Sequence, residues 1–207
     1  MRIPIFKFWA ICFAALIFIP ARAQKTIVFS DPIKHYNQAL ELFDKEKYGP
    51  AQTEFERFIE SNPQEPILTN ALFYKAICAL EMKNYQAEIE LGLLLEKNPE
   101  HIKANFARFR LGKYFYQNKK YPKAIEQYKE VDSEALTQDE RKEYWFNLGH
   151  SYFETEKYAE AKGYLTRTSK NKDKYFYPSN YYLGYIVMLE NELDAALNYF
   201  NNVQSSK

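Results

Sequence analysis

Cysteine, histidine and glycine are scarce in this sequence, and each shortage argues against a class of function. The chain has two cysteines, Cys12 and Cys78, and only Cys78 lies outside the apolar amino-terminal segment, so we expect no internal disulfide. Cys78 falls in an apolar stretch of a predicted helix, where a cysteine is typically a small core residue. The three histidines, His35, His101 and His150, lack metal-ligand spacing, and the six glycines form no nucleotide-binding or hydrolase motif. We therefore expect no catalytic, metal or cofactor site.

An excess of charge of either sign is also missing. The chain has 28 Lys and Arg residues against 27 Asp and Glu residues, for a formal net charge of +1. Removal of residues 1–23 would take away three basic residues and no acidic ones, which changes the net charge to −2. Nucleic-acid-binding proteins need a basic face to meet the phosphates. The balance of charge therefore argues against a nucleic-acid partner.

The amino terminus has the pattern of a signal peptide. Basic residues precede and flank an apolar run from Phe8 to Ile19, and an Ala-x-Ala motif ends at Ala23. The run is about 12 residues long, shorter than the roughly 18 or more that a membrane span needs. We predict a signal peptide over residues 1–23, a short leader over 24–31 and export without lipidation. The alternative is an uncleaved anchor, which would make this a membrane-anchored structural protein.

A strong helical pattern lies between Lys142 and Thr168. Apolar or small residues recur there at the i, i+3, i+4 and i+7 spacing of one helix face, first over 145–152 and then over 158–165. A short polar stretch separates the two runs, so we predict two helices joined by a tight turn. The motif W-x-x-L-G-x-x-Y, followed by Y-x-x-A, resembles the tetratricopeptide repeat, a helix-turn-helix of about 34 residues that stacks in arrays.

Two positions of this motif recur along the whole chain with one period. The small residue expected where the two helices of a hairpin cross occurs at Ala39, Ala76, Gly112, Gly149 and Gly184. The residue expected to open the second helix occurs at Tyr48, Tyr85, Tyr121, Tyr158 and Leu193. Both series have separations of 37, 36, 37 and 35 residues. We therefore predict an all-α fold, a right-handed α-solenoid of about five antiparallel helix hairpins over 32–66, 67–102, 103–137, 138–174 and 175–207.

Two parts of the predicted solenoid depart from the family pattern. In the second hairpin, Glu88 stands where the family has Ala, and Gly92 stands where it has a large apolar residue. We therefore expect a shifted or loosened second helix over 85–97. In the last hairpin, no polar helix follows to cover the open side, so we expect partial exposure of its final apolar residues, which are Tyr199, Phe200 and Val203.

The resemblance also implies a binding surface on the first helix of each hairpin. In the family these helices line the concave face of the stack, and the corresponding residues here form an aromatic-rich strip. Its first row is Tyr36, Phe73, Phe109, Phe146 and Tyr181, and the other two rows include Lys113, His150 and Tyr185, and Tyr116 and Phe153. The resemblance implies a groove for an extended peptide or a partner helix, with Lys113 and His150 as polar contacts. The alternatives are that most of the strip is core between hairpins, or that it stacks on sugars such as peptidoglycan.

These patterns together predict a non-enzymatic protein–protein interaction scaffold of the bacterial cell envelope. We expect it in the periplasm or on the periplasmic face of the outer membrane, with a protein or peptide partner. The resemblance suggests processes such as outer-membrane assembly, secretion or cell-wall remodelling. The alternative is that the hairpins are the amino-terminal part of a larger envelope enzyme or peptidoglycan-binding protein, in which case further repeats or a domain follow Lys207.

Overall fold

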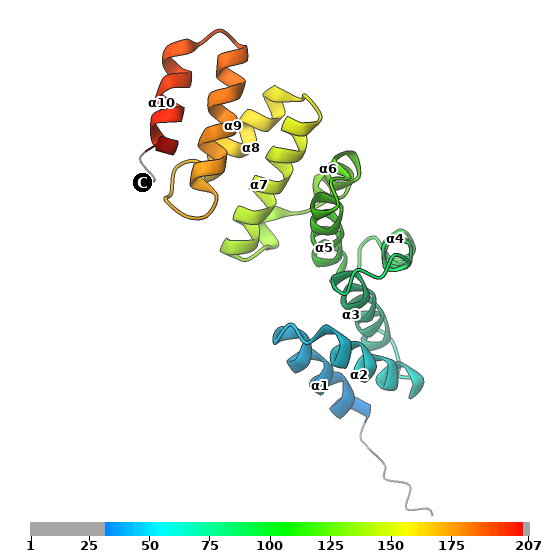
Figure 1. Cartoon of the computed structure of the whole chain (residues 1–207). Helices are drawn as coiled ribbons and strands as arrows, with labels where there is room; N and C mark the ends of the chain where they lie inside the picture. Colours follow the sequence, from blue (N-terminus) through cyan, green and yellow to red (C-terminus); the bar gives the residue numbers. More distant parts are fainter. Residues whose placement is uncertain (1–31, 205–207) are drawn as a thin grey trace, which may run out of the picture. The chain divides into compact units, whose positions relative to one another are not determined.

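The computed structural model describes residues 32–204, which form ten α-helices and one short 3-10 helix (Figure 1). The helices are α1 (Pro32–Asp44), α2 (Tyr48–Glu60), α3 (Ile67–Glu81), α4 (Ala87–Lys97), α5 (Ala104–Gln117), α6 (Tyr121–Lys129), η1 (Ser133–Ala135), α7 (Gln138–Glu154), α8 (Tyr158–Thr168), α9 (Phe176–Leu189) and α10 (Leu193–Gln204). This part of the chain contains no strand, so the predicted all-α class is confirmed. The predicted signal peptide and leader lie outside the described residues. None of the described helices is long and apolar enough to cross a membrane.

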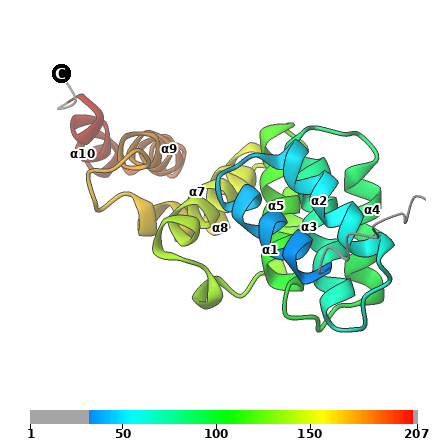
Figure 2. The ribbon, with the colours of Figure 1, turned by 90° about the horizontal axis from the view of Figure 1, so that it is seen from below.

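Consecutive helices pair as hairpins, and each hairpin packs on the next. The pairs are α1 with α2, α3 with α4, α5 with α6, α7 with α8, and α9 with α10. The second helix of each hairpin also contacts the first helix of the following one, and α7 lies between α5 and α9 (Figure 2). In such a stack a hairpin buries its apolar sides largely against its neighbours, so stability is close to a sum over units and junctions.

The five hairpin turns share one backbone geometry. Each contains a residue with φ between 56° and 64°, and these residues are Glu46, Lys83, Lys119, Glu156 and Asn191. The next residue donates its N–H to the carbonyl oxygen five residues earlier, as Lys120 does to Phe115 at 2.8 Å. This is the Schellman arrangement, which ends a helix and satisfies its last carbonyl groups. The same turn therefore reverses the chain in every hairpin.

The predicted helix crossings are confirmed by the space around the small residues. A Cβ added at Gly112 would lie 2.8 Å from the ring of Tyr128 in α6, and one at Gly149 would lie 2.9 Å from the Leu165 side chain in α8. The same close approach occurs at Gly184, and the two alanines at the equivalent earlier positions are fully buried. The two helices of these hairpins therefore meet at the residue with the smallest side chain.

The second hairpin is irregular at the predicted place. Helix α4 begins at Ala87 and not at Tyr85, and the Tyr85 side chain is 75% exposed. The Glu88 carboxylate lies 2.7 Å from Lys120 Nζ, outside the hairpin to which it belongs. A Cβ at Gly92 would have no neighbour within 4 Å. The predicted shift of this helix is confirmed, because a carboxylate at an alanine position pairs with a neighbouring cation instead of packing at the crossing.

Candidate partner-binding site on the first helices

Two rings that we expected in the groove lining belong to the core. Phe73 and Phe109 are fully buried. The Phe109 ring lies 6.3 Å from the ring of Tyr128 in α6, and the Phe73 ring stacks on His101 at 5.1 Å. Tyr128 belongs to the second helix of the same hairpin and His101 to the segment after α4, and α7 of the next hairpin also packs against α5 beside Phe109. The assignment of Phe73 and Phe109 to a binding surface is therefore corrected.

Four other rings of the predicted strip are half-buried between helices, and these are Tyr36, Tyr116, Phe146 and Phe153. The Phe146 ring lies 5.1 Å from the Tyr175 ring, and the Phe153 ring lies 4.7 Å from the Tyr182 ring of α9. Tyr36 packs against two phenylalanine rings of α2 at 5.0 and 5.9 Å. These side chains stabilise the packing of helices, which agrees with the alternative that much of the strip is core.

His150 lies inside a cluster of aromatic side chains. His150 is 9% exposed, and the centroids of five aromatic rings lie between 4.5 and 6.3 Å from the centroid of its imidazole ring. The rings belong to Tyr116, Tyr121, Phe146, Phe153 and Tyr182. Glu154 Oε1 lies 3.1 Å from the His150 Nε2 atom. Burial lowers the pKa of His150, and the Glu154 carboxylate partly opposes this shift. His150 is therefore part of the packing between α5, α7 and α9, and not the surface contact that we expected.

The lowered pKa of His150 predicts a loss of stability in mild acid. The folded-state pKa lies below the ordinary value of 6.5, so the unfolded chain takes up the proton first as the pH falls. Protonation therefore favours unfolding below about pH 6.5. Urea unfolding at pH 7.5 and 5.5 should show a larger loss for the wild type than for His150→Phe. His35, His101 and the carboxylates are common to both proteins, so equal losses would contradict the prediction.

The remaining aromatic positions of the strip are exposed at the end of the stack. Tyr181 and Tyr185 lie on α9, where no later described hairpin covers them. Tyr199, Phe200 and Val203 are half-buried, as expected for the final apolar residues of the chain. The predicted strip is thus buried in the middle of the stack and reaches the surface at its carboxyl end.

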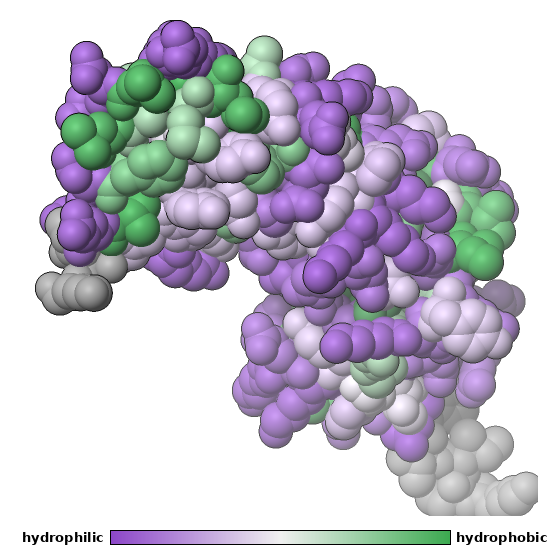
Figure 3. Space-filling model, turned by 45° about the horizontal axis from the view of Figure 1, so that its top comes forward, coloured by the Kyte–Doolittle hydropathy of each residue, from purple (hydrophilic) through white to green (hydrophobic). Residues whose placement is uncertain are grey.

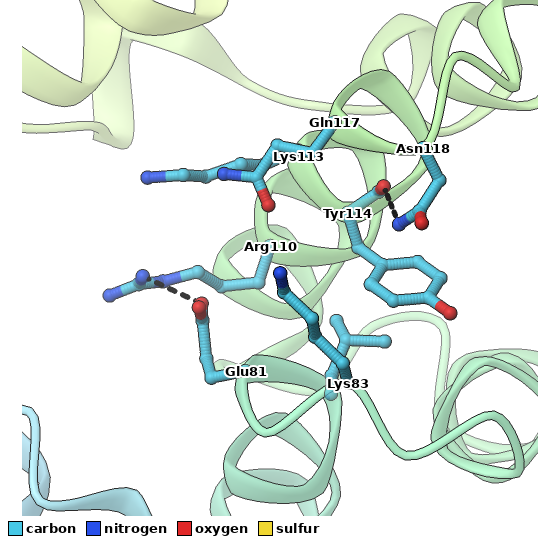
Figure 4. A pocket seen from close by; sticks show the side chains of 8 residues that line it. Glu81, Lys83, Arg110, Lys113, Tyr114, Gln117 and Asn118 are labelled. Atoms are coloured by element: carbon cyan, nitrogen blue, oxygen red, sulfur yellow. Dashed lines mark hydrogen bonds and ion pairs between the residues drawn. The ribbon is translucent and has the colours of Figure 1, made fainter.

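A pocket of about 360 Å³ lies between the carboxyl end of α3 and helix α5 (Figure 4). Its lining is Leu80, Glu81, Lys83, Arg110, Lys113, Tyr114, Gln117 and Asn118. Lys113 is the one residue of this set that we predicted as a binding residue. The pocket lies on the first helices, where the family resemblance places ligand contacts.

Ion pairs hold two of the pocket cations in place. Arg110 Nη1 lies 2.9 Å from Glu81 Oε1, and its guanidinium carbon lies 4.9 Å from the centroid of the Phe106 ring. Lys113 Nζ lies 2.9 Å from Glu143 Oε1 of α7, so this lysine links two hairpins. Both side chains are less than a quarter exposed. Their cationic groups are therefore fixed before any ligand arrives.

Lys83 is the cation of the pocket with no ion-pair partner among residues 32–204. It occupies the positive-φ position of the turn after α3, and its amine extends into the space in front of Arg110 and Tyr114 (Figure 4). The Gln117 carboxamide lies on the same rim, and Asn118 is used within the turn because it donates to the Tyr114 carbonyl oxygen at 2.8 Å. An ammonium, a guanidinium and a carboxamide together suit a carboxylate ligand.

Sequence reasoning missed Lys83 and Arg110. Lys83 lies in a turn, and Arg110 lies next to a row position and not on it. A signal for Lys83 was present, because the turn position before each second helix recurs with the same period as the crossing residue.

Neither a metal-holding cluster nor a reactive thiol is present among residues 32–204. No group of three or more His, Cys, Asp or Glu residues within 32–204 is placed to hold a metal ion. Cys78 is buried, and burial raises the pKa of its thiol to about 12, so it is not a ready nucleophile.

Comparison with known protein families identifies tetratricopeptide repeats in two segments of the chain. A family model described as "Tetratricopeptide repeat" matches residues 36–102, and another with the same description matches residues 142–167. The chain is 28% identical over 157 residues to the Hsp70-Hsp90 organising protein of Plasmodium falciparum (isolate 3D7). That alignment covers 62% of this chain and 27% of the relative, so the chain spans about a quarter of the relative's length.

Solved structures share the fold at low sequence identity. MamA from Desulfovibrio magneticus RS-1 has a TM-score of 0.63 and 16% identity, with 84% of this chain and 93% of that chain covered. The MamA structure designated AMB-1 has a TM-score of 0.65 and 14% identity, with 85% and 98% covered. A Podosopora anserina kinesin light chain with TPR-like repeats has a TM-score of 0.59 and 13% identity, with 85% and 96% covered. At these identities the likeness concerns the fold alone.

Proposed function

Because the chain belongs to the tetratricopeptide-repeat family, we propose that it is a non-enzymatic scaffold that binds an acidic segment of a partner protein between α3 and α5. The observation that supports the acidic ligand is the charge of the pocket. Three cations line it, of which Arg110 pairs with Glu81 and Lys113 with Glu143, and Lys83 has no ion pair within the described part of the chain. Carboxylates form their strongest hydrogen bonds with cationic donors of this kind.

The size and lining of the pocket favour part of a peptide over a whole small molecule. Pockets for drug-sized ligands hold roughly 300–1,000 Å³ and are lined mostly by apolar side chains. This pocket, at about 360 Å³, is at the lower end, and six of its eight lining residues are charged or carry an amide or guanidinium group. It therefore suits one or two acidic side chains, or a terminal carboxylate, of an extended segment.

Export to the cell envelope is part of the same proposal. Its support is the signal-peptide pattern over residues 1–23, with basic residues, an apolar run and an Ala-x-Ala motif in the order that secretion requires. We place the scaffold in the periplasm or on the periplasmic face of the outer membrane.

Charge reversal at Lys83 tests the pocket. Lys83→Glu places a carboxylate where the ligand's carboxylate would lie, so affinity for acidic peptides should fall at least about tenfold. The protein would be used to select peptides from a random dodecapeptide display library, and the retained sequences would be counted for Asp and Glu. We expect enrichment of acidic residues by the wild type and loss of that enrichment by Lys83→Glu.

Lys119→Glu is the matched control. Lys119 occupies the same positive-φ turn position in the next hairpin, is exposed, and does not line the pocket. The Lys119→Glu variant should retain the preference of the wild type for acidic peptides. Absence of enrichment in the wild type would contradict an acidic ligand, and equal enrichment by Lys83→Glu would place the binding site elsewhere.

A further inference from the structure

An exposed apolar patch covers the last described hairpin. It consists of six side chains that are 36–64% exposed, and these are Tyr181, Tyr185, Met188, Leu189, Leu193 and Leu197. We call this patch the α9–α10 face. Figure 3 shows apolar side chains gathered over this hairpin, at the upper left of the view. Contiguous apolar surface of this kind usually marks an interaction site.

The equivalent positions of an earlier hairpin are covered by a helix. Phe109 and Ile125 lie 72 residues before Tyr181 and Leu197, which is two repeat periods. Both earlier side chains are buried, because α7 packs across α5 and α6. The α9–α10 face therefore has the residue pattern of a surface that receives a helix within this same chain.

Acidic residues cluster at the turn of the α9–α10 hairpin. Residues 176–204 contain Glu190, Glu192 and Asp194 and no Lys, Arg or His. All three acidic residues fall between Leu189 and Leu197, at the turn of the hairpin. Glu190 pairs with Lys162 of α8 at 2.5 Å, whereas Glu192 and Asp194 have no ion pair among the described residues. The hairpin that carries the apolar patch is therefore net negative, and Glu190 and Glu192 both act on Lys162 of α8.

We propose that the α9–α10 face docks a basic amphipathic helix of a partner protein. The apolar stripe of that helix would contact Leu193, Leu197 and the aromatic rings of α9, and its Lys or Arg residues would meet Glu192 and Asp194. Helices recognised in this way present apolar side chains at i, i+3 or i+4, and i+7. Opposite charge at the rim adds specificity and speeds association. This surface is separate from the pocket between α3 and α5, so the inference does not depend on the proposed acidic ligand.

A second copy of the chain fits this surface less well. Pairing of two α9–α10 faces would bring their carboxylates together as water is excluded, which is unfavourable for like charges. In head-to-tail stacking, the α9–α10 face of one copy would meet the exposed side of α1 of the next copy. That side of α1 is mostly polar and includes Lys34, Asn37, Gln38 and Glu41. Charge and polarity together therefore favour a basic partner.

Two designed peptides test this inference. One is a fluorescein-labelled helix of Leu and Lys, about 18 residues long with all Leu on one face, and the other has Glu in place of Lys. Fluorescence anisotropy at physiological salt should show binding of the Lys peptide, with the Glu peptide at least tenfold weaker. Leu193→Asp/Leu197→Asp should weaken the Lys peptide at least tenfold, and Glu192→Lys/Asp194→Lys should reverse the preference between the peptides.

The matched control is Ile89→Asp/Leu93→Asp on α4. Leu193 and Leu197 are 64% and 60% exposed, and Ile89 and Leu93, at the same spacing on another second helix, are 62% and 60% exposed. This control should bind the Lys peptide as the wild type does. Equal binding of the two peptides, or unchanged binding by Leu193→Asp/Leu197→Asp, would overturn the proposal. Sedimentation that shows a dimer abolished by the same double substitution would assign the face to a second copy and also overturn it.

Discussion

Replacing Tyr128 with alanine is expected to lower the free energy of unfolding by about 3–5 kcal/mol. Tyr128 is fully buried in α6, and its ring lies 6.3 Å from that of Phe109 in α5 and 5.5 Å from that of Tyr144 in α7. It also fills the space in front of Gly112. Its loss would leave a cavity both at a helix crossing and at the junction between two hairpins.

A second variant separates the cavity from the hydrogen bond. The Tyr128 hydroxyl accepts a hydrogen bond from Asn147 Nδ2 at 3.1 Å, and burial raises the pKa of this hydroxyl well above its ordinary value. Tyr128→Phe keeps the ring and leaves the buried amide without this partner, so we expect a loss of about 1–3 kcal/mol. The difference between the stability losses of Tyr128→Ala and Tyr128→Phe is therefore the cost of the cavity.

Urea unfolding followed by circular dichroism measures both losses. Tyr85→Ala is the control, because that ring is the exposed aromatic of the second hairpin and its removal should change stability by less than about 0.5 kcal/mol. A loss below about 1 kcal/mol for Tyr128→Ala would contradict the packing described here. Because Tyr128 joins two units of a stack, its removal should also broaden the transition as the two sides begin to unfold separately.

The repeated units could be predicted from the sequence because two constraints recur in it. The helix crossing needs a small residue such as Gly149, and the second helix opens at an aromatic or apolar residue such as Tyr158. Both requirements are local to one hairpin, so they leave a period in the sequence. The disturbance of α4 was predictable for the same reason, since Glu88 breaks a local rule.

The exposure of the aromatic strip could not be predicted, because it depends on neighbouring hairpins. Phe109 and Tyr181 occupy the same position of the repeat, yet the first is buried under a neighbour and the second is half exposed at the end of the stack. A repeat motif defines where a residue lies within its own hairpin, but it does not determine whether a neighbouring helix covers that residue. The pocket was missed for a related reason, because Lys83 and Arg110 meet only through the packing of α3 against α5.

Two glycine substitutions in one hairpin are expected to have opposite effects. Gly149→Ala should lower stability by about 1–3 kcal/mol, because the new Cβ would lie 2.9 Å from Leu165 Cγ and 3.1 Å from the Leu165 backbone nitrogen. The Leu165 side chain can rotate away, but the backbone contact is relieved only if α7 and α8 move apart. At Gly163, within α8, an added Cβ would have no neighbour within 4 Å, so Gly163→Ala should raise stability by about 0.5–1 kcal/mol.

Comparing the two variants isolates the effect of the helix crossing, because the chemical change is identical in both. Both substitutions reduce the freedom of the unfolded chain in the same way, and both replace Gly by Ala within a helix. The difference in unfolding free energy between them, about 1.5–4 kcal/mol in thermal or urea unfolding, therefore measures the close approach of α7 to α8. If Gly149→Ala were as stabilising as Gly163→Ala, the two helices would not meet at Gly149. Since a small residue, Ala or Gly, recurs at the crossing of every hairpin, the close approach could then no longer explain the repeat period.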